Sequence, residues 1–271
     1  MNSLDGKIAV VTGAAQGLGA AVARLFAEAG AVGLITCDRN AEKGQAVAAE
    51  ITEQFGVPTE FVAADLAEIS DIRAVIAQAK QRFGQIDILV NAAGITDRGS
   101  LIDTSPELFD RLVAVNLRGP FFMMQEAVKV MIETGRPGSI VNIGSISGFA
   151  GQSFICPYVA TKGGLSSLTR NTAFGLLRNQ IRVNQLDVGW MASDNEISLQ
   201  AEERGDPNWL ENAAAERPFG RLLDPREAAK GVLFLASDDS GMMTGTVIPF
   251  DQSVWGGYPG LAPSPDAPMS L

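Results

Sequence analysis

The sequence predicts an α/β fold, in which a doubly wound parallel sheet of seven strands carries helices on both faces within a single domain. Short apolar runs rich in β-branched residues alternate with segments of helical periodicity along most of the chain. The runs are apolar almost throughout, as expected of parallel strands that are buried on both faces. The length of 271 residues is also normal for one α/β domain.

The predicted strands are 8–12, 32–37, 59–64, 86–91, 139–144, 181–186 and 245–250. The predicted helices between them are 17–29, 41–55, 69–83, 106–134, 157–178 and 225–236. Because parallel strands are joined by right-handed crossovers, each helix is expected to pass over one face of the sheet. No linker or internal repeat interrupts this order. We therefore expect one domain over 1–256 and a proline-rich tail over 257–271 that is extended or disordered.

The composition argues against several classes of function. The net charge of −10 disfavours nucleic acid and anionic membranes as partners, because phosphates need clustered Lys and Arg. No apolar run reaches membrane length, and the N-terminus shows no signal-peptide pattern. The chain has no histidine, and its two cysteines, Cys37 and Cys156, form no metal-ligand spacing. We expect a reduced, cytoplasmic protein without zinc or copper, while a carboxylate site for Mg²⁺ or Ca²⁺ stays open.

A glycine-rich turn, TGAAQGLG, joins the first strand to the first helix over 12–19. Such a turn lets backbone N–H groups approach a pyrophosphate, and the helix dipole adds to the attraction. A tight turn with close helix packing would use the same glycines. We predict a dinucleotide site that involves Gly13, Gln16, Gly17, Leu18 and Gly19.

The second strand ends at Asp38 and Arg39, about 20 residues beyond this turn. A carboxylate at this place accepts hydrogen bonds from the ribose hydroxyls and repels a 2′-phosphate. The turn itself contains no cation. We therefore predict NAD rather than NADP, although Arg39 is able to swing toward a phosphate. Asp38 has an alternative role as the N-cap of the next helix.

Two further strand ends are expected at the ligand crevice, because the carboxyl ends of the strands line it in this kind of sheet. Asp65 follows the third strand and is able to accept from an adenine amine, with Leu66 packed nearby. The segment NAAG, Asn91 to Gly94, ends the fourth strand and offers small residues for close approach of a cofactor. Each of these residues is alternatively a simple turn residue.

Tyr158 and Lys162, in PYVATKGG, lie at positions i and i+4 and therefore share one face of a helix. An ammonium at about 4 Å, worth up to roughly 4 kcal/mol at an effective dielectric of 20, would lower the pKa of a phenol by about 2–3. Tyr158 would then exchange a proton with an alcohol or a carbonyl near neutral pH. The pair alone fits an ordinary amphipathic helix with a partly buried tyrosine at least as well.

Two other residues strengthen the chemical interpretation. Ser145 ends the fifth strand, in SIVNIGSISG, and its hydroxyl is able to bond the reacting oxygen. Asn116 interrupts an apolar helix in VAVNLRGPFF, and a buried amide needs hydrogen-bond partners. We expect Asn116 to bend the helix and to hold a water that connects Lys162 to solvent.

The segments TGAAQGLG, NAAG, VNLRGPFF, GSISG and YVATK, in this order and spacing, resemble the short-chain dehydrogenase/reductase family over about residues 5–251. The resemblance implies a Rossmann fold, usually a tetramer, and a catalytic tetrad of Asn116, Ser145, Tyr158 and Lys162. In that scheme Tyr158 is the acid/base and Ser145 orients the substrate oxygen. Lys162 lowers the tyrosine pKa and bonds the nicotinamide ribose, while Asn116 supports a proton relay. The cofactor supplies the hydride chemistry.

The turn after the sixth strand departs from the family pattern, which usually has Pro-Gly where this chain has Val188 and Gly189. Valine loosens a turn that proline would stiffen. Ser193 still offers a hydroxyl where the family often has threonine for the carboxamide. Asp187 is unusual near the reacting centre, where it touches the substrate or caps the turn. The complete set of predicted cofactor-binding residues is Gly13, Gln16, Gly17, Leu18, Gly19, Asp38, Arg39, Asp65, Leu66, Asn91, Ala92, Ala93, Gly94, Tyr158, Lys162, Val188, Gly189, Met191 and Ser193.

The segment 190–222, which we name the lid, has no strand pattern and is expected to cover the substrate. Over 190–217 its acids (Asp194, Glu196, Glu202, Glu203, Asp206, Glu211 and Glu216) outnumber its bases (Arg204 and Arg217). This surface would repel the negative charge of an acyl-carrier protein or coenzyme A. Aromatic faces near amides and carboxylates suit a small polar substrate, and the chain most resembles the sugar and polyol dehydrogenases of the family. The candidate substrate residues are Ser147, Gln152, Asp187, Trp190 and Trp209, although Trp209 is alternatively a packing residue of the lid.

The leading prediction is thus an NAD-dependent dehydrogenase of a small polyol or sugar, cytoplasmic and homotetrameric. One alternative is a reductase of another carbonyl substrate, such as a 3-oxoacyl thioester or a hydrophobic ketone. An alternative of another class is an NAD-sensing binding protein without catalysis, against which the intact Ser145, Tyr158 and Lys162 argue. Near the C-terminus, Trp255 and Tyr258 are expected either to reach a neighbouring subunit or simply to pack.

Overall fold

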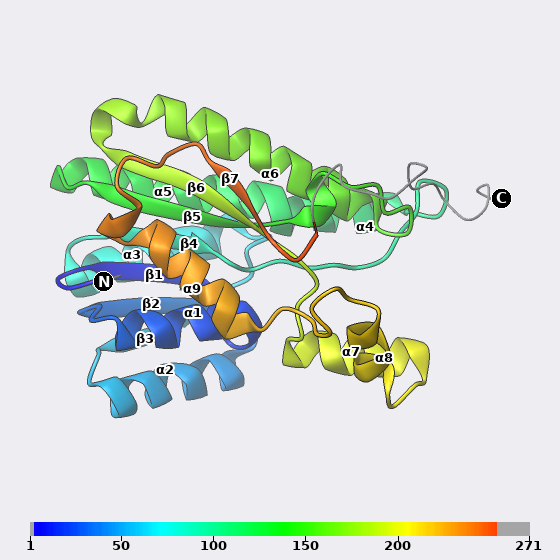
Figure 1. The fold of residues 1–271 in the computed structure, drawn as a ribbon. Coiled ribbons are helices and arrows are strands. Elements are labelled where there is room, and N and C mark those ends of the chain that lie inside the picture. The colour runs from blue at the N-terminus through cyan, green and yellow to red at the C-terminus, as the bar shows by residue number, and fades with distance from the viewer. Residues whose placement is uncertain (1–2, 254–271) are drawn as a thin grey trace.

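Seven strands within the described residues, 3–253, form one parallel sheet in the computed structural model (Figure 1). They are β1 (Ile8–Thr12), β2 (Gly33–Asp38), β3 (Thr59–Ala63), β4 (Ile88–Asn91), β5 (Gly138–Ser145), β6 (Ile181–Val188) and β7 (Val247–Phe250). Their order across the sheet is β3-β2-β1-β4-β5-β6-β7. The order reverses between β1 and β4, which is the place where open α/β sheets bind ligands. The predicted seven-stranded parallel sheet is confirmed.

Helices cover both faces of this sheet (Figure 1). They are α1 (Gly17–Glu28), α2 (Ala41–Phe55), α3 (Ile69–Phe83), α4 (Pro106–Val113), α5 (Gly119–Thr134), α6 (Cys156–Gly175), α7 (Asp194–Arg204), α8 (Trp209–Ala215) and α9 (Pro225–Ala236). One buried core joins α1, α2 and α9 to the sheet, and a second joins α3, α5 and the end of α6 to its other face. Apolar strand residues contribute to both cores, which explains their nearly continuous apolar runs.

The single helix predicted over 106–134 is wrong at its centre. A π-helical turn, Ala114–Arg118, separates α4 from α5. Asn116 lies in this turn, where its Oδ1 accepts from the backbone N–H of Ile95 and its Nδ2 donates to the Ile95 carbonyl, both at 2.9 Å. Such widened turns accommodate an inserted polar contact and recur at functional sites. The helix is therefore interrupted at Asn116 by this turn, and the backbone of Ile95 bonds its amide.

The lid forms two helices, α7 and α8, which lie to one side of the sheet in Figure 1. They pack around a small apolar core that includes Trp209, Ala213 and Leu222. None of the helices within residues 3–253 combines the length and apolar character that crossing a membrane requires. The tail predicted over 257–271, and with it Trp255 and Tyr258, lies outside the described residues.

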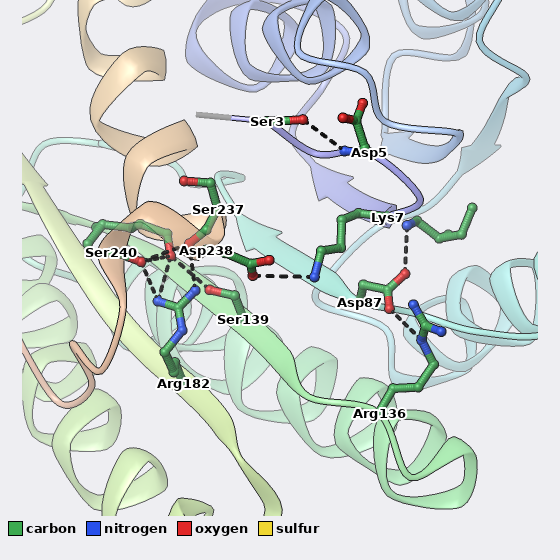
Figure 2. A network of polar contacts seen from close by, with 12 residues as sticks. Ser3, Asp5, Lys7, Asp87, Arg136, Ser139, Arg182, Ser237, Asp238 and Ser240 are labelled. Atoms are coloured by element: carbon green, nitrogen blue, oxygen red, sulfur yellow. Dashed lines mark hydrogen bonds and ion pairs between the residues drawn. The ribbon is translucent and has the colours of Figure 1, made fainter. Parts of the chain in front are cut away.

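A polar network holds the amino-terminal edge of the sheet (Figure 2). Asp87, just before β4, is 2% exposed and accepts from the backbone N–H of Ile8 at 2.8 Å and from Nε of Arg136 at 2.9 Å. Nearby, the guanidinium of Arg182 on β6 donates to the carbonyls of Leu235 and Ser237, each at 2.9 Å. These contacts connect the starts of β1, β4 and β6 to the end of α9. They stabilise the amino-terminal edge of the sheet.

We predict that Asp87→Ala lowers the free energy of unfolding by about 1–3 kcal/mol, because the buried N–H of Ile8 loses its acceptor. Chemical denaturation monitored by circular dichroism measures the loss. Glu53→Ala, which removes an exposed carboxylate from α2, is the control and is expected to change little. An unchanged unfolding free energy in Asp87→Ala would contradict the proposed role of this contact.

Candidate active site

The predicted site residues gather at the opposite, carboxyl-terminal edge of the sheet. There the chain leaves β1 at Thr12, β4 at Asn91, β5 at Ser145 and β6 at Val188. Because these strands are parallel neighbours, their ends bring residues that are distant in sequence into one crevice.

The glycine-rich turn packs tightly against the segment after β4. Thr12 Oγ1 accepts from the backbone N–H groups of Ala92 and Ala93, at 3.0 and 3.1 Å. A Cβ on Gly13 would lie only 2.7 Å from the Cα of Ala93. Gly13 and Gly17 have φ values of 69° and 55°, which side chains rarely tolerate. The turn thus needs glycine for its geometry, and α1 begins directly at Gly17.

Asp38 faces this turn from the end of β2. Its Oδ2 lies 3.3 Å from the backbone N of Ala15, and its Oδ1 accepts from the N–H of Asn40 at 2.9 Å. The sequence interpretation missed one cation here: Lys43, on the first turn of α2, donates from Nζ to Gln16 Oε1 at 3.3 Å. No sequence spacing links Lys43 to the turn, since the contact arises only because α2 folds back beside it.

These features fit a dinucleotide. The turn and the N-terminus of α1 allow backbone N–H groups to approach a pyrophosphate closely. The Asp38 carboxylate lies beside the turn, where it would accept hydrogen bonds from ribose hydroxyls. Arg39 is exposed beside it. Ser193 also adjoins the turn, because a Cβ on Gly17 would lie 3.5 Å from the Ser193 Cβ.

The other predicted cofactor residues lie in different surroundings, and several of them turn their side chains into the core. Asp65 uses its Oδ1 to accept from the N–H of Ala67 at 2.9 Å, and Leu66 is buried in the core. Asn91 is also buried and turns its side chain inward, where Nδ2 donates to Asn142 Oδ1 at 2.8 Å. Gly189 donates its backbone N–H to the carbonyl of Phe250 at 3.2 Å, which holds the turn after Val188 against β7. Met191 forms an isolated bridge with Leu223 and packs against the first core.

The four residues of the predicted tetrad are brought together. Ser145 lies near enough to Tyr158 for its hydroxyl to lower the pKa of the phenol. Lys162 is 5% exposed and donates from Nζ to the backbone carbonyl of Ile143 at 2.8 Å. A Cβ on Gly94 would lie 3.3 Å from Asn116 Oδ1 and 3.6 Å from Lys162 Nζ, so both groups adjoin the end of β4.

The pKa of Tyr158 is raised rather than lowered in this structure, and Lys162 is not among the groups that shift it. Burial raises the pKa of Tyr158 to about 12, against a lowering by the Ser145 hydroxyl, and the charges of Asp187 and Glu196 raise it further. Lys162 does not approach the phenolic oxygen as an ion pair, because its Nζ is directed to the Ile143 carbonyl and lies 5.7 Å from the ring centroid. The phenol is therefore a proton donor at neutral pH.

The predicted substrate residues divide into two groups. Ser147 donates from its hydroxyl to Gln152 Oε1 at 2.5 Å, so these two residues brace the loop after β5. Trp190 stacks on Trp209 with ring centroids 5.9 Å apart, but Trp209 is only 2% exposed and packs the lid. Asp187 is fully buried. Neither Trp209 nor Asp187 presents a surface to a substrate.

A small cavity of about 60 Å³ lies beside the site and is lined in part by Ile146, Trp190, Arg217, Asp251 and Gln252. The guanidinium of Arg217 lies 5.3 Å above the ring of Trp190. The cavity thus combines an aromatic wall with charged and amide groups. A larger hollow of about 640 Å³, between the lid and the start of α9, contains none of the predicted site residues.

The fold and this site define a nicotinamide-dependent oxidoreductase of the Rossmann type. The sequence family described as enoyl-(acyl carrier protein) reductase matches residues 13–254. The chain is 37% identical to an uncharacterized oxidoreductase, YxbG, of Bacillus subtilis over 94% of this chain and 93% of that protein. It is 36% identical to a 3-oxoacyl-[acyl-carrier-protein] reductase, FabG, of Thermotoga maritima over 92% and 97%.

A sugar-oxidising relative and a solved structure are similarly close. The chain is 35% identical to the L-rhamnose 1-dehydrogenase (NAD(P)(+)) of Azotobacter vinelandii over 90% of this chain and 95% of that protein. The crystal structure of L-sorbose reductase from Gluconobacter frateurii, complexed with NADPH and L-sorbose, superposes with a TM-score of 0.90 at 26% identity, covering 95% of this chain and all of that one. The chain belongs to the short-chain dehydrogenase/reductase family of oxidoreductases.

We predict that Tyr158→Phe lowers turnover by about 10²–10⁴, because it removes the one phenol among residues 3–253 and leaves Ser145 and Lys162 in place. Steady-state rates measure the loss, and quenching of protein fluorescence by NADH measures binding, which is expected to stay near wild type. The matched control is Phe154→Leu, a change in an exposed ring before α6. Retention of most activity in Tyr158→Phe would rule out this residue as the acid/base.

Proposed function

We propose that the protein transfers a hydride between NAD(H) and a secondary alcohol or ketone of a small polyol or sugar. The observation that carries the proposal is the grouping of Ser145 and Tyr158 beside Lys162 at the carboxyl-terminal edge of the sheet. Asn116 completes the set from the π-helical turn. The proposal includes these four residues as the catalytic group.

In this proposal the residues of the chain transfer the proton and bind the substrate oxygen. Tyr158 donates its phenolic proton to the oxygen of a ketone in reduction and takes the hydroxyl proton back in oxidation. Ser145 bonds the same oxygen and fixes its distance from the phenol. Lys162 presents a cation to the nicotinamide ribose, and Gly94 leaves room for that approach. Bound nicotinamide supplies or accepts the hydride.

A polar substrate is supported by the small cavity beside Ser145. Its wall includes the Trp190 ring and the polar side chains of Arg217, Asp251 and Gln252. The names of the rhamnose dehydrogenase and the sorbose reductase support the same substrate class. The similarity to a 3-oxoacyl reductase supports the second candidate, a thioester substrate.

NAD is proposed as the cofactor because the Asp38 carboxylate stands next to the glycine-rich turn. A negative charge there opposes the 2′-phosphate of NADP and accepts from ribose hydroxyls. Lys43 and Arg39 are the cations that would hold such a phosphate. The NAD(P) name of one relative and the NADPH in the sorbose reductase show that this family tolerates both forms.

A cytoplasmic homotetramer is also proposed. The apolar side chains of Phe109 on α4, Phe121 and Ile132 on α5, and Phe174 on α6 are exposed, which supports burial of these helices between copies. Cys37 and Cys156 are both free thiols, as expected in a reducing compartment. Light scattering of the purified chain, 28.5 kDa per copy, distinguishes a tetramer from smaller assemblies.

The decisive experiment offers NAD⁺ or NADP⁺ with a panel of polyols, aldoses and simple secondary alcohols, and NADH with ketoses and a 3-oxoacyl thioester. We expect turnover with NAD⁺ on polyhydroxy compounds and none on the thioester. Reduced cofactor is followed by its absorbance, with Tyr158→Phe as the background. Activity confined to the thioester or to apolar alcohols would leave the oxidoreductase and overturn the polyol and sugar assignment.

We predict that Asp38→Ser lowers the ratio of kcat/KM for NAD⁺ to that for NADP⁺ by about 10–100-fold. The change removes charge-assisted hydrogen bonds worth about 1.5–3 kcal/mol, together with the repulsion of a phosphate. Lys43→Ala is expected to lower only the use of NADP⁺. Glu42→Gln, which alters the neighbouring exposed carboxylate on α2, is the control. An unchanged ratio in Asp38→Ser would show that this carboxylate does not select the cofactor.

A further inference from the structure

A layer of buried polar side chains lies between α6 and the sheet, one helical turn from Lys162. Its members are buried almost completely and join β4, β5 and β6 to the helix; we name it the polar layer. It consists of Asn91, Asn142, Ser166, Thr169, Gln185 and Asp187. Asn91 Nδ2 donates to Asn142 Oδ1 at 2.8 Å, and Asn142 Nδ2 donates to Thr169 Oγ1 at 2.9 Å.

Gln185 links this layer to Asp187. Its Nε2 donates to Ser166 Oγ at 2.7 Å and to Asp187 Oδ1 at 2.6 Å, so both amide hydrogens are used. Ser166 in turn donates to the backbone carbonyl of Lys162 at 3.2 Å. The orientation of the Asp187 carboxylate is thus set by side chains of the helix that carries Tyr158 and Lys162.

The site of Asp187 is shaped for a carboxylate. Asp187 is 0% exposed and pairs in register with Gly144, the residue before Ser145. A Cβ on Gly144 would overlap Asp187 Oδ1, so the absence of a side chain there makes the room. Asp187 Oδ2 has no hydrogen-bond partner among residues 3–253. A carboxylate buried in this way is costly unless an opposite charge compensates it.

The charged groups around Asp187 come from several elements. On α6, Lys162 and Arg170 both favour the carboxylate form, although burial dominates and raises the pKa of Asp187 to about 6. Glu196 on α7 acts with Asp187 on Tyr158. The facing segment of β5 offers only Ile143, Gly144 and Ser145, none of which bears a charge, and Asp251 lies beyond β7 beside Gly189.

Lys162 is also a buried charge, of the opposite sign. Burial lowers the pKa of this ammonium to about 8, and the charge of Asp187 is the one influence that raises it. No direct ion pair joins the two groups in the described part of the chain, so the attraction acts through space. Lys162 bonds the carbonyl of Ile143, and Asp187 faces Gly144, the next residue of β5, so the two opposite charges lie at neighbouring positions along that strand.

We propose that Asp187 is the buried counter-ion of Lys162. As a positioning residue, it keeps the lysine ammonium charged beside Tyr158 and Ser145. The importance of that charge for turnover rests on the proposed function, whereas the electrostatic pairing does not. A small neutral side chain at position 187 would leave Lys162 as an uncompensated buried cation. The ammonium would then lose its proton at lower pH.

The test is a pH titration of the lysine side chains by ¹³C NMR in the ligand-free protein. The chain has six lysines, and loss of a resonance in Lys162→Arg assigns the buried one. In Asp187→Asn we expect the midpoint of Lys162 to fall by about one pH unit, a tenfold change in proton affinity. The matched control is Asp87→Asn, which removes another buried carboxylate at the far edge of the sheet and should leave the midpoint unchanged.

An equal Lys162 midpoint in Asp187→Asn and the wild type would overturn the proposal. Asp187→Ser repeats the measurement if the asparagine variant does not fold. The wild type alone is also a test. A Lys162 midpoint below about 7 would overturn the proposal, because it means that no counter-ion keeps the ammonium charged near neutral pH.

A second readout separates this inference from the proposed function. In Asp187→Asn the alkaline limb of the profile of kcat/KM against pH should move to lower pH by the same amount as the Lys162 midpoint. A shifted lysine midpoint with an unshifted rate profile supports the counter-ion and contradicts the proposed catalytic role of the Lys162 charge. The substrate panel is independent of both results.

Discussion

The hydrogen bond from Lys162 to the carbonyl of Ile143 fixes helix α6 along strand β5, and the geometry of the whole site depends on it. Tyr158 lies one turn before Lys162, while Ser145 lies two residues after Ile143 at the end of the strand. A shift of the helix by one turn would therefore separate the phenol from the Ser145 hydroxyl that acts on it. The polar layer makes such a shift costly, because every member on α6 would lose a buried partner.

The two edges of the sheet differ in how completely their polar groups are satisfied. At the amino-terminal edge, Asp87 and Arg182 direct their polar atoms to backbone and side-chain partners. Within residues 3–253 the buried side-chain atoms without a partner are Asn91 Oδ1, Asp187 Oδ2 and Arg217 Nε, and all three adjoin the crevice or the lid. Folded proteins leave few such atoms, and those that persist concentrate where function competes with stability.

Much of this arrangement is readable in the sequence, because it follows from local patterns. Apolar runs predict the buried parallel strands, and the glycine-rich turn predicts its own conformation at Gly13 and Gly17. The spacing of Tyr158 and Lys162 predicts a shared helix face. The strand alternation that carries Gln185 and Asp187 to one face is equally visible, but the empty space at Gly144 depends on the register between β5 and β6.

Other features are set by tertiary contacts that no local pattern contains. The π-helical turn arises where Asn116 meets the backbone of Ile95. Lys43 reaches the glycine-rich turn only through the fold of α2. The shared helix face of Tyr158 and Lys162 predicts a lowered pKa for the phenol. The sign is reversed because the ammonium turns to a strand carbonyl while burial and the Asp187 charge act on the phenol.

The charge of Asp187 acts in the same sense on both partners, since it raises the pKa of Lys162 and that of Tyr158. Burial is the main cause of the raised phenol pKa, and the Asp187 carboxylate adds to it while also favouring the charged form of the ammonium. A site that holds its protons in this way is prepared to give one to a carbonyl oxygen. Oxidation of an alcohol requires the phenol to release that proton first, against the same charge. With Tyr158 as the acid/base of the proposed function, this protonation favours reduction at neutral pH and predicts an alkaline rise in oxidation for as long as Lys162 stays protonated.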